Sequence, residues 1–145
     1  VEFSQGDFAV RVLCQHWTRA TIEESRLLGI PSRQRVLSRQ VQLICAGSIC
    51  IYARSIIPLS ALKGKHRRLL FLGERPLGSY LFTNPGLKRG TQHLAKIRRQ
   101  DPLFKIALRG THSDCEHIWG RRSLFTIDDC PLLVSEFFLP ALFNR

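Results

Sequence analysis

Two long apolar runs separated by a three-residue turn constrain the fold of this chain more than any other feature. Residues 34–45 and 49–57 are rich in Val, Ile and Leu, and only Ala46-Gly47-Ser48 joins them. Such runs are typical of β-strands, and a connection this short holds two strands antiparallel. We therefore predict a β-hairpin that ends at Pro58, because proline cannot continue a central strand.

A second pair of strand-like runs lies near the end of the sequence. Residues 121–127 and 132–139 are joined by Asp128-Asp129-Cys130-Pro131, which contains the residues that turns favour. Residues 8–14 alternate apolar side chains with others, and this two-residue period is typical of a half-buried strand. We expect these segments and the first hairpin to form one antiparallel sheet.

Helical signals occur between the predicted strands. Thr21 and Glu24 have the spacing of a capping box, and Gly29 marks the end of the short helix that they begin. Residues 60–72 return to helical spacing, and another short helix is predicted to start at Pro76. The helices are thus grouped between strands and do not alternate with them one for one.

This arrangement predicts a single α+β domain over residues 1–145, built on an antiparallel β-sheet. Residues 87–99 are basic and mixed, and residues 100–110 give no firm period, so neither element type is predicted there. Hydrophobic residues make up 44% of the chain, which supports a folded core.

The charge of the chain implies an anionic partner. It carries 22 Lys and Arg against 11 Asp and Glu, a formal net charge of +11. Nucleic acid, an acidic membrane surface and a small polyanionic substrate all fit such a surplus, and solubility alone also accounts for it. The positions of the charges must decide among these interpretations.

Two features bear on the compartment. No apolar run approaches the roughly 20 residues that span a bilayer, and the first residues lack the pattern of a signal peptide. The five cysteines are odd in number and form no Cys-x-x-Cys pair, so a disulfide framework is not expected. We expect a cytoplasmic protein with no membrane span.

Two charged residues fall on apolar faces of the predicted strands. Arg39 is in phase with Val41 and Leu43, and Glu136 is in phase with Val134 on the last strand. A charge left unpaired inside a protein costs several kcal/mol, so each side chain needs a counter-charge or a polar ligand. One interpretation is a structural ion pair between the two, and the other is a site where they hold opposite ends of one ligand.

Other arginines occupy less informative positions. Arg54 shares a strand face with Tyr52 and Ile56, but a surface role is equally open. Alternation sends Arg121 and Arg122 to opposite faces of their strand, so at most one of them can face a pocket.

Five segments, in this order along the chain, resemble the chorismate pyruvate-lyase family. They are Arg39-Gln40-Val41-Gln42-Leu43-Ile44-Cys45, Ala53-Arg54-Ser55-Ile56-Ile57-Pro58-Leu59, Pro76-Leu77-Gly78 with Tyr80-Leu81-Phe82, Trp119-Gly120-Arg121-Arg122-Ser123, and Pro131-Leu132-Leu133-Val134-Ser135-Glu136-Phe137-Phe138-Leu139-Pro140. The match runs from about Phe8 to Leu142, and the last two segments are its most specific parts.

The resemblance implies an antiparallel α+β domain with an enclosed ligand cavity. It implies a lyase that converts chorismate to 4-hydroxybenzoate and pyruvate without a cofactor, at the first committed step toward ubiquinone. The family's roles would make Arg39 the anchor of the ring carboxylate, together with the backbone at Leu77. Glu136 would meet the ring hydroxyl as a catalytic group, and Arg54 would hold the enolpyruvyl carboxylate and stabilise the leaving group.

One departure from the family concerns the start of the sequence. The family has a helix and a Gly-Ser-Leu-Thr-like turn before its first strand, and residues 3–6 resemble the tail of that region. We therefore expect the N-terminal part of the family's domain to lie upstream of Val1. We also expect a monomer whose partners are chorismate and 4-hydroxybenzoate.

Three other functions compete with this interpretation. His112, Asp114, Cys115, Glu116 and His117 crowd potential metal ligands together, but their spacing matches no zinc pattern, and a solvated loop is the simpler interpretation. Basic clusters at residues 63–68, 88–89 and 98–99 could bind nucleic acid, but no recognition motif accompanies them, so no specific complex is expected. A non-catalytic small-molecule sensor of the same fold is the remaining alternative.

Overall fold

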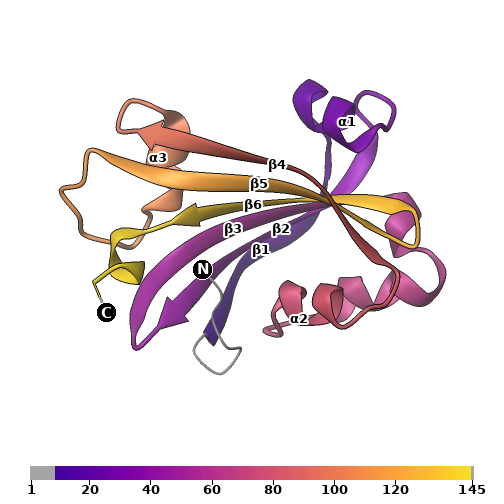
Figure 1. The fold of residues 1–145 in the computed structure, drawn as a ribbon, viewed down its shortest axis with the longest axis horizontal. Coiled ribbons are helices and arrows are strands. Elements are labelled where there is room, and N and C mark those ends of the chain that lie inside the picture. Colours follow the sequence, from indigo (N-terminus) through magenta and orange to yellow (C-terminus); the bar gives the residue numbers. More distant parts are fainter. Residues whose placement is uncertain (1–8, 145) are drawn as a thin grey trace.

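The computed structural model describes residues 9–144, which form a six-stranded antiparallel sheet with short helices on both faces (Figure 1). Its strands, in spatial order, are β1 (Ala9–Arg19), β2 (Arg35–Cys45), β3 (Ser48–Pro58), β6 (Cys130–Phe138), β5 (His117–Ile127) and β4 (Leu87–Arg98). The two predicted hairpins, β2–β3 and β5–β6, therefore lie side by side in the middle of the sheet. The predicted α+β class with an antiparallel sheet is confirmed.

Both hairpins turn through two residues with positive φ. Ala46 and Gly47 have φ values of 48° and 83°, and Asp128 and Asp129 have φ values of 48° and 66°. Such turns match the twist of the strands that they join. The second turn is two residues shorter than predicted, because Cys130 and Pro131 already belong to β6.

The helices are short. They are α1 (Ile22–Leu28), the 3-10 helices η2 (Leu59–Leu62) and η3 (Gly64–Phe71), α2 (Leu77–Phe82), α3 (Pro102–Ala107) and the 3-10 helix η4 (Pro140–Leu142). The capping box of α1 is present as predicted, since the Thr21 side chain accepts from the Glu24 N–H and the Glu24 side chain accepts from the Thr21 N–H.

Different elements cover the two faces of the sheet. On one face α1 packs against Ile56 and Leu133, and α3 packs near Tyr52. On the other face η2, η3 and α2 pack against Ile57 and Leu132. Figure 1 shows this division, with α1 and α3 above the sheet and α2 below it.

Several elements differ from the sequence predictions. Residues 60–72 form two 3-10 helices, because Lys63 is extended and Gly64 takes a positive φ of 66°. β4 and α3 occupy the region for which no element was predicted. β1 continues to Arg19, well beyond the predicted segment, while Phe8 and the family-like tail at residues 3–6 lie outside the described residues.

Candidate functional site

A pocket of about 680 Å³ lies between the sheet and α2, and we call it the central pocket. Its volume is in the range of small-molecule sites. Most of its lining is apolar, and its charged lining residues are Arg39, Arg89, Arg121 and Glu136. The walls formed by residues 9–144 leave the pocket partly open, so these residues do not form the enclosed cavity that the resemblance implied.

Arg39 is the buried cation of this pocket, with 2% of its surface exposed. Its Nη1 donates to Gln15 Oε1 at 3.4 Å, and its Nη2 donates to the carbonyl oxygen of Arg75 at 3.0 Å. Burial lowers the pKa of Arg39, but a guanidinium stays protonated at neutral pH. No carboxylate of the described residues pairs with it. Two of its five N–H groups are used in these bonds, which leaves donors for a ligand.

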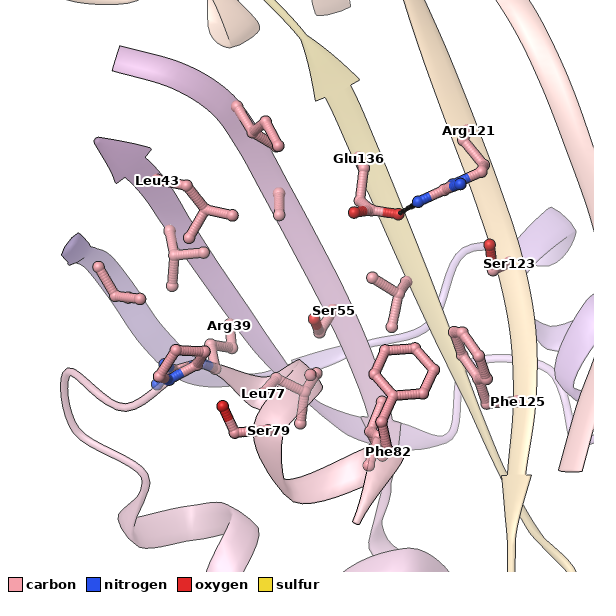
Figure 2. Close-up of a pocket in the computed structure, with 18 of the residues that line it drawn as sticks. Arg39, Leu43, Ser55, Leu77, Ser79, Phe82, Arg121, Ser123, Phe125 and Glu136 are labelled. Atoms are coloured by element: carbon pink, nitrogen blue, oxygen red, sulfur yellow. Dashed lines mark hydrogen bonds and ion pairs between the residues drawn. The ribbon is translucent and has the colours of Figure 1, made fainter. Parts of the chain in front are cut away.

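The surroundings of Arg39 fix its position and add another polar group. Gln15, which accepts from Arg39, itself donates from Nε2 to the carbonyl oxygen of Leu70 at 2.9 Å. The Ser79 hydroxyl of α2 is buried and has no hydrogen-bond partner among residues 9–144. Figure 2 shows Ser79, Leu77 and Arg39 at the end of the central pocket that α2 covers. This end therefore combines an unneutralised cation with an unused hydroxyl.

Glu136 lies farther along the sheet and is paired with Arg121. Arg121 Nε and Nη2 donate to Glu136 Oε1 at 3.1 Å and 2.9 Å, across the β5–β6 pairing. The guanidinium of Arg121 also lies 5.5 Å from the centre of the Phe138 ring. The structural ion pair between Arg39 and Glu136 is thus absent: both residues line one pocket, but Glu136 has another partner (Figure 2).

The register of the sheet sets the separation of Arg39 and Glu136. Arg39 lies opposite Ser55, and Ser55 lies opposite Val134 on β6. Two strand spacings of about 4.8 Å and one two-residue step of about 6.8 Å put the Cα atoms of Arg39 and Glu136 about 12 Å apart on a flat sheet. A ring-sized ligand fits between side chains that start at this separation.

The prediction that Arg54 faces the ligand is wrong for the central pocket. Its neighbours Ala53 and Ser55 line the pocket, and alternation along β3 directs Arg54 to the opposite face. There it forms an ion pair with Glu24 of α1. Arg122 likewise points away from the pocket and pairs with Glu23 at 2.8 Å, so only one arginine of the Arg121-Arg122 pair faces the pocket, as predicted.

Leu77, the backbone group implied by the resemblance, is the first residue of α2 and lines the central pocket. A buried histidine ties this helix to the hairpin turn: His66 Nδ1 lies 2.8 Å from Tyr80 Oη, and His66 Nε2 lies 2.5 Å from Asp128 Oδ2. Lys65 Nζ also contacts Asp128 Oδ2, at 2.9 Å. Hydrogen bonds from Lys65 and His66 lower the pKa of Asp128.

Other classes of site find less support. Within residues 9–144, nowhere do three His, Cys, Asp or Glu side chains gather as metal ligands would, and this holds for the segment from His112 to His117. None of the helices in this range has the length and apolar character needed to cross a bilayer.

Sequence reasoning missed several residues that line the central pocket or hold Arg39 in place. Gln15 and Ser79 carry no charge and belong to no motif that the sequence analysis used, so no sequence signal identified them as site residues. Arg89 was considered only as part of a basic cluster. Alternation limited the pocket-facing arginine to Arg121 or Arg122 but did not say which. The pairing of Arg121 with Glu136 could not be predicted, because it depends on which strands are neighbours.

Comparison with known sequences identifies a family. A profile described as "Chorismate lyase" matches residues 2–145. A probable chorismate pyruvate-lyase of Methylococcus capsulatus is 40% identical over 140 residues, which cover 96% of this chain and 85% of that protein. A probable chorismate pyruvate-lyase of Chromohalobacter salexigens is 42% identical over 139 residues, covering 96% of this chain and 72% of that protein.

Comparison with solved structures supports the fold alone. A GntR-family transcriptional regulator from Bacillus cereus superposes with a TM-score of 0.68 at 18% identity, covering 96% of both chains. The ligand-binding domain of a putative GntR-family regulator from Bordetella bronchiseptica gives the same TM-score at 17% identity, covering 94% of this chain and 88% of that one.

Proposed function

Because the chain belongs to the chorismate lyase family, we propose that it converts chorismate into 4-hydroxybenzoate and pyruvate. One observation carries the proposal: Arg39 is buried in the wall of a pocket and no described carboxylate neutralises it. A buried cation is stable only with a counter-charge, and the carboxylate of an aromatic acid would supply one.

We assign the ring carboxylate to the α2 end of the central pocket. The planar guanidinium of Arg39 suits a two-pronged bond to a carboxylate. The Ser79 hydroxyl and the backbone N–H of Leu77 would complete the binding of its oxygens. Glu136 would meet the ring hydroxyl, and the two hydrogen bonds from Arg121 hold its carboxylate in position.

The reaction itself makes modest demands on these groups. The ether bond between the ring and the enolpyruvyl group breaks, and the ring carbon that bears the hydroxyl loses a proton. The departing enolpyruvate gains one proton and becomes pyruvate, so no electrons are exchanged with another molecule. Because aromatisation drives the reaction, the protein needs only to orient the substrate and stabilise the departing oxygen. A redox cofactor is not part of this balance.

The direct test is to mix the purified protein with chorismate and follow the absorbance of 4-hydroxybenzoate, with pyruvate measured by a coupled dehydrogenase. We expect equal amounts of both products. Chorismate that remains unchanged in the presence of folded protein would refute the proposal. A positive result would also support a role at the entry to ubiquinone synthesis; the cytoplasmic location and monomeric state stay predictions.

A second candidate is a ligand sensor without catalytic activity. The fold is shared with the ligand-binding domain of a GntR-family regulator. A sensor would bind 4-hydroxybenzoate or chorismate but release no pyruvate. The same assay therefore separates the two candidates.

A further inference from the structure

The charges that line the central pocket do not balance. Three arginines and one glutamate line it, so the lining has a formal charge of +2. Arg121 and Glu136 neutralise each other. The two remaining cations are Arg39 and Arg89, and neither has an ion pair with a carboxylate in the range 9–144. A ligand with two negative charges would complete this arrangement.

We propose that Arg89 binds the second carboxylate of the substrate, the one on the enolpyruvyl group, while Arg39 binds the first. This assignment rests on the proposed function, since chorismate carries two carboxylates and 4-hydroxybenzoate carries one. Arg89 replaces Arg54 in this role, because Arg54 lies on the opposite face of the sheet and is paired with Glu24.

The placement of Arg89 suits this role. It lies on the edge strand β4, opposite Phe125, and its guanidinium lies 4.8 Å from the centre of the Phe82 ring on α2. This stacking holds the guanidinium at the rim of the pocket between the sheet edge and α2, with its N–H groups free at the edges of the planar group. Phe82 thereby positions Arg89 without neutralising its charge.

Arg39 and Arg89 approach the pocket from opposite sides. Arg39 is on β2 and Arg89 is on β4, with β3, β6 and β5 between them. Four strand spacings amount to about 19 Å, which the two long side chains shorten from both ends. Glu136 is on β6, the middle one of these strands, and is displaced along the sheet from the rows of both Arg39 and Arg89. The two unneutralised cations therefore lie on opposite sides of the pocket, as the two carboxylates of one ligand would require.

The exposure of Arg89 has a consequence for the products. Arg39 is buried, whereas Arg89 is exposed at the rim. The enolpyruvyl end of the substrate would then face solvent, and pyruvate would leave first by that route. Because 4-hydroxybenzoate has no second carboxylate, Arg89 would favour binding of the substrate over binding of the product.

The test compares Arg89→Ala with Lys88→Ala. Both variants remove one exposed positive charge from adjacent residues of β4, but Lys88 does not line the pocket. For Arg89→Ala we expect KM for chorismate to rise about tenfold, the scale of one charge-assisted hydrogen bond. We expect its Kd for 4-hydroxybenzoate, measured by calorimetry, to stay within twofold. Lys88→Ala should leave both values within twofold of wild type, and Arg89→Lys should recover part of the loss.

Two outcomes would overturn the assignment. One is an unchanged KM for chorismate in Arg89→Ala, and the other is an equal loss of affinity for chorismate and 4-hydroxybenzoate. Thermal unfolding of each variant identifies a loss that comes from misfolding. If the wild-type protein binds chorismate without converting it, the proposed function fails, but the ratio of the two Kd values still tests Arg89.

Discussion

Replacing Arg39 with methionine should abolish ligand binding without weakening the unliganded fold. In the fold alone, Arg39→Met removes two hydrogen bonds to neutral acceptors, one of them long at 3.4 Å. Their loss costs about 3 kcal/mol. Against this, the substitution removes an unneutralised charge from a site that is 2% exposed, whose desolvation costs several kcal/mol. We expect the unfolding free energy to stay the same or to rise by up to about 3 kcal/mol.

Arg39→Met should strongly weaken ligand binding, although it leaves the unliganded fold as stable as before or more stable. A two-pronged bond between a guanidinium and a carboxylate contributes about 3–6 kcal/mol, so Kd for 4-hydroxybenzoate should rise by about 10² to 10⁴. At a ligand concentration of about 100 times its Kd, the wild-type protein gains about 2.7 kcal/mol of stability, equivalent to a rise in Tm of several degrees. The variant should gain at most about 0.4 kcal/mol at the same concentration, so its Tm should rise by no more than a degree or two.

Thermal unfolding with and without 4-hydroxybenzoate measures both effects in one series. Arg54→Met is the matched contrast, because it removes an arginine that is paired with the buried Glu24 carboxylate and should lower Tm. If Arg39→Met unfolds the protein, or if it keeps the ligand-induced rise in Tm, then Arg39 has a structural role and the reasoning is refuted.

Three further substitutions test other parts of the site. Ser79→Ala should raise Kd for 4-hydroxybenzoate about tenfold with no loss of stability, because the hydroxyl has no partner within the described part of the chain; an unchanged Kd would remove it from the carboxylate site. Glu136→Gln should lower kcat/KM by about 10² while Tm falls only slightly, since its ion pair is partly exposed; wild-type turnover would contradict its role. Asp128→Asn should lower Tm at neutral pH. The pKa of Asp128 is lowered in the folded state, so its contribution to stability is complete above about pH 4 and is lost as the pH falls through the folded value. The difference in Tm from wild type should therefore shrink below pH 4, and a constant difference down to pH 2 would refute this.

The strands that could be predicted are those with one or two buried faces. β2 and β3 are mostly buried, so their apolar runs were visible in the sequence. β4 was missed because it is an edge strand, and only Ile97 among its twelve residues is buried. Neither the alternating pattern nor the continuous apolar run of a strand arises where almost no side chain contacts the core. Its existence depends on pairing with β5, which a local pattern does not contain.

The site was predictable in part, and Arg54 illustrates the limit. Periodicity correctly grouped Arg54 with Tyr52 and Ile56, and it correctly placed Arg39 and Glu136 on apolar faces. It could not tell which of two covered faces holds the pocket. That choice depends on α1, which brings Glu24 to Arg54, and on α2, which leaves a pocket over the opposite face.

The pairing of the arginines shows why Arg39 is better explained by a ligand than by stability. Arg54, Arg99, Arg121 and Arg122 all have a carboxylate partner, and their side chains are 31% to 51% exposed. Arg39 is the buried arginine of residues 9–144, and it has none. Desolvation makes an unpaired charge most costly where burial is greatest, so a fold selected for stability alone would show the reverse order. This exception, Arg39, lies in the wall of a pocket beside the unpartnered hydroxyl of Ser79. An anionic ligand bound there would supply the counter-charge that offsets the cost of desolvating Arg39.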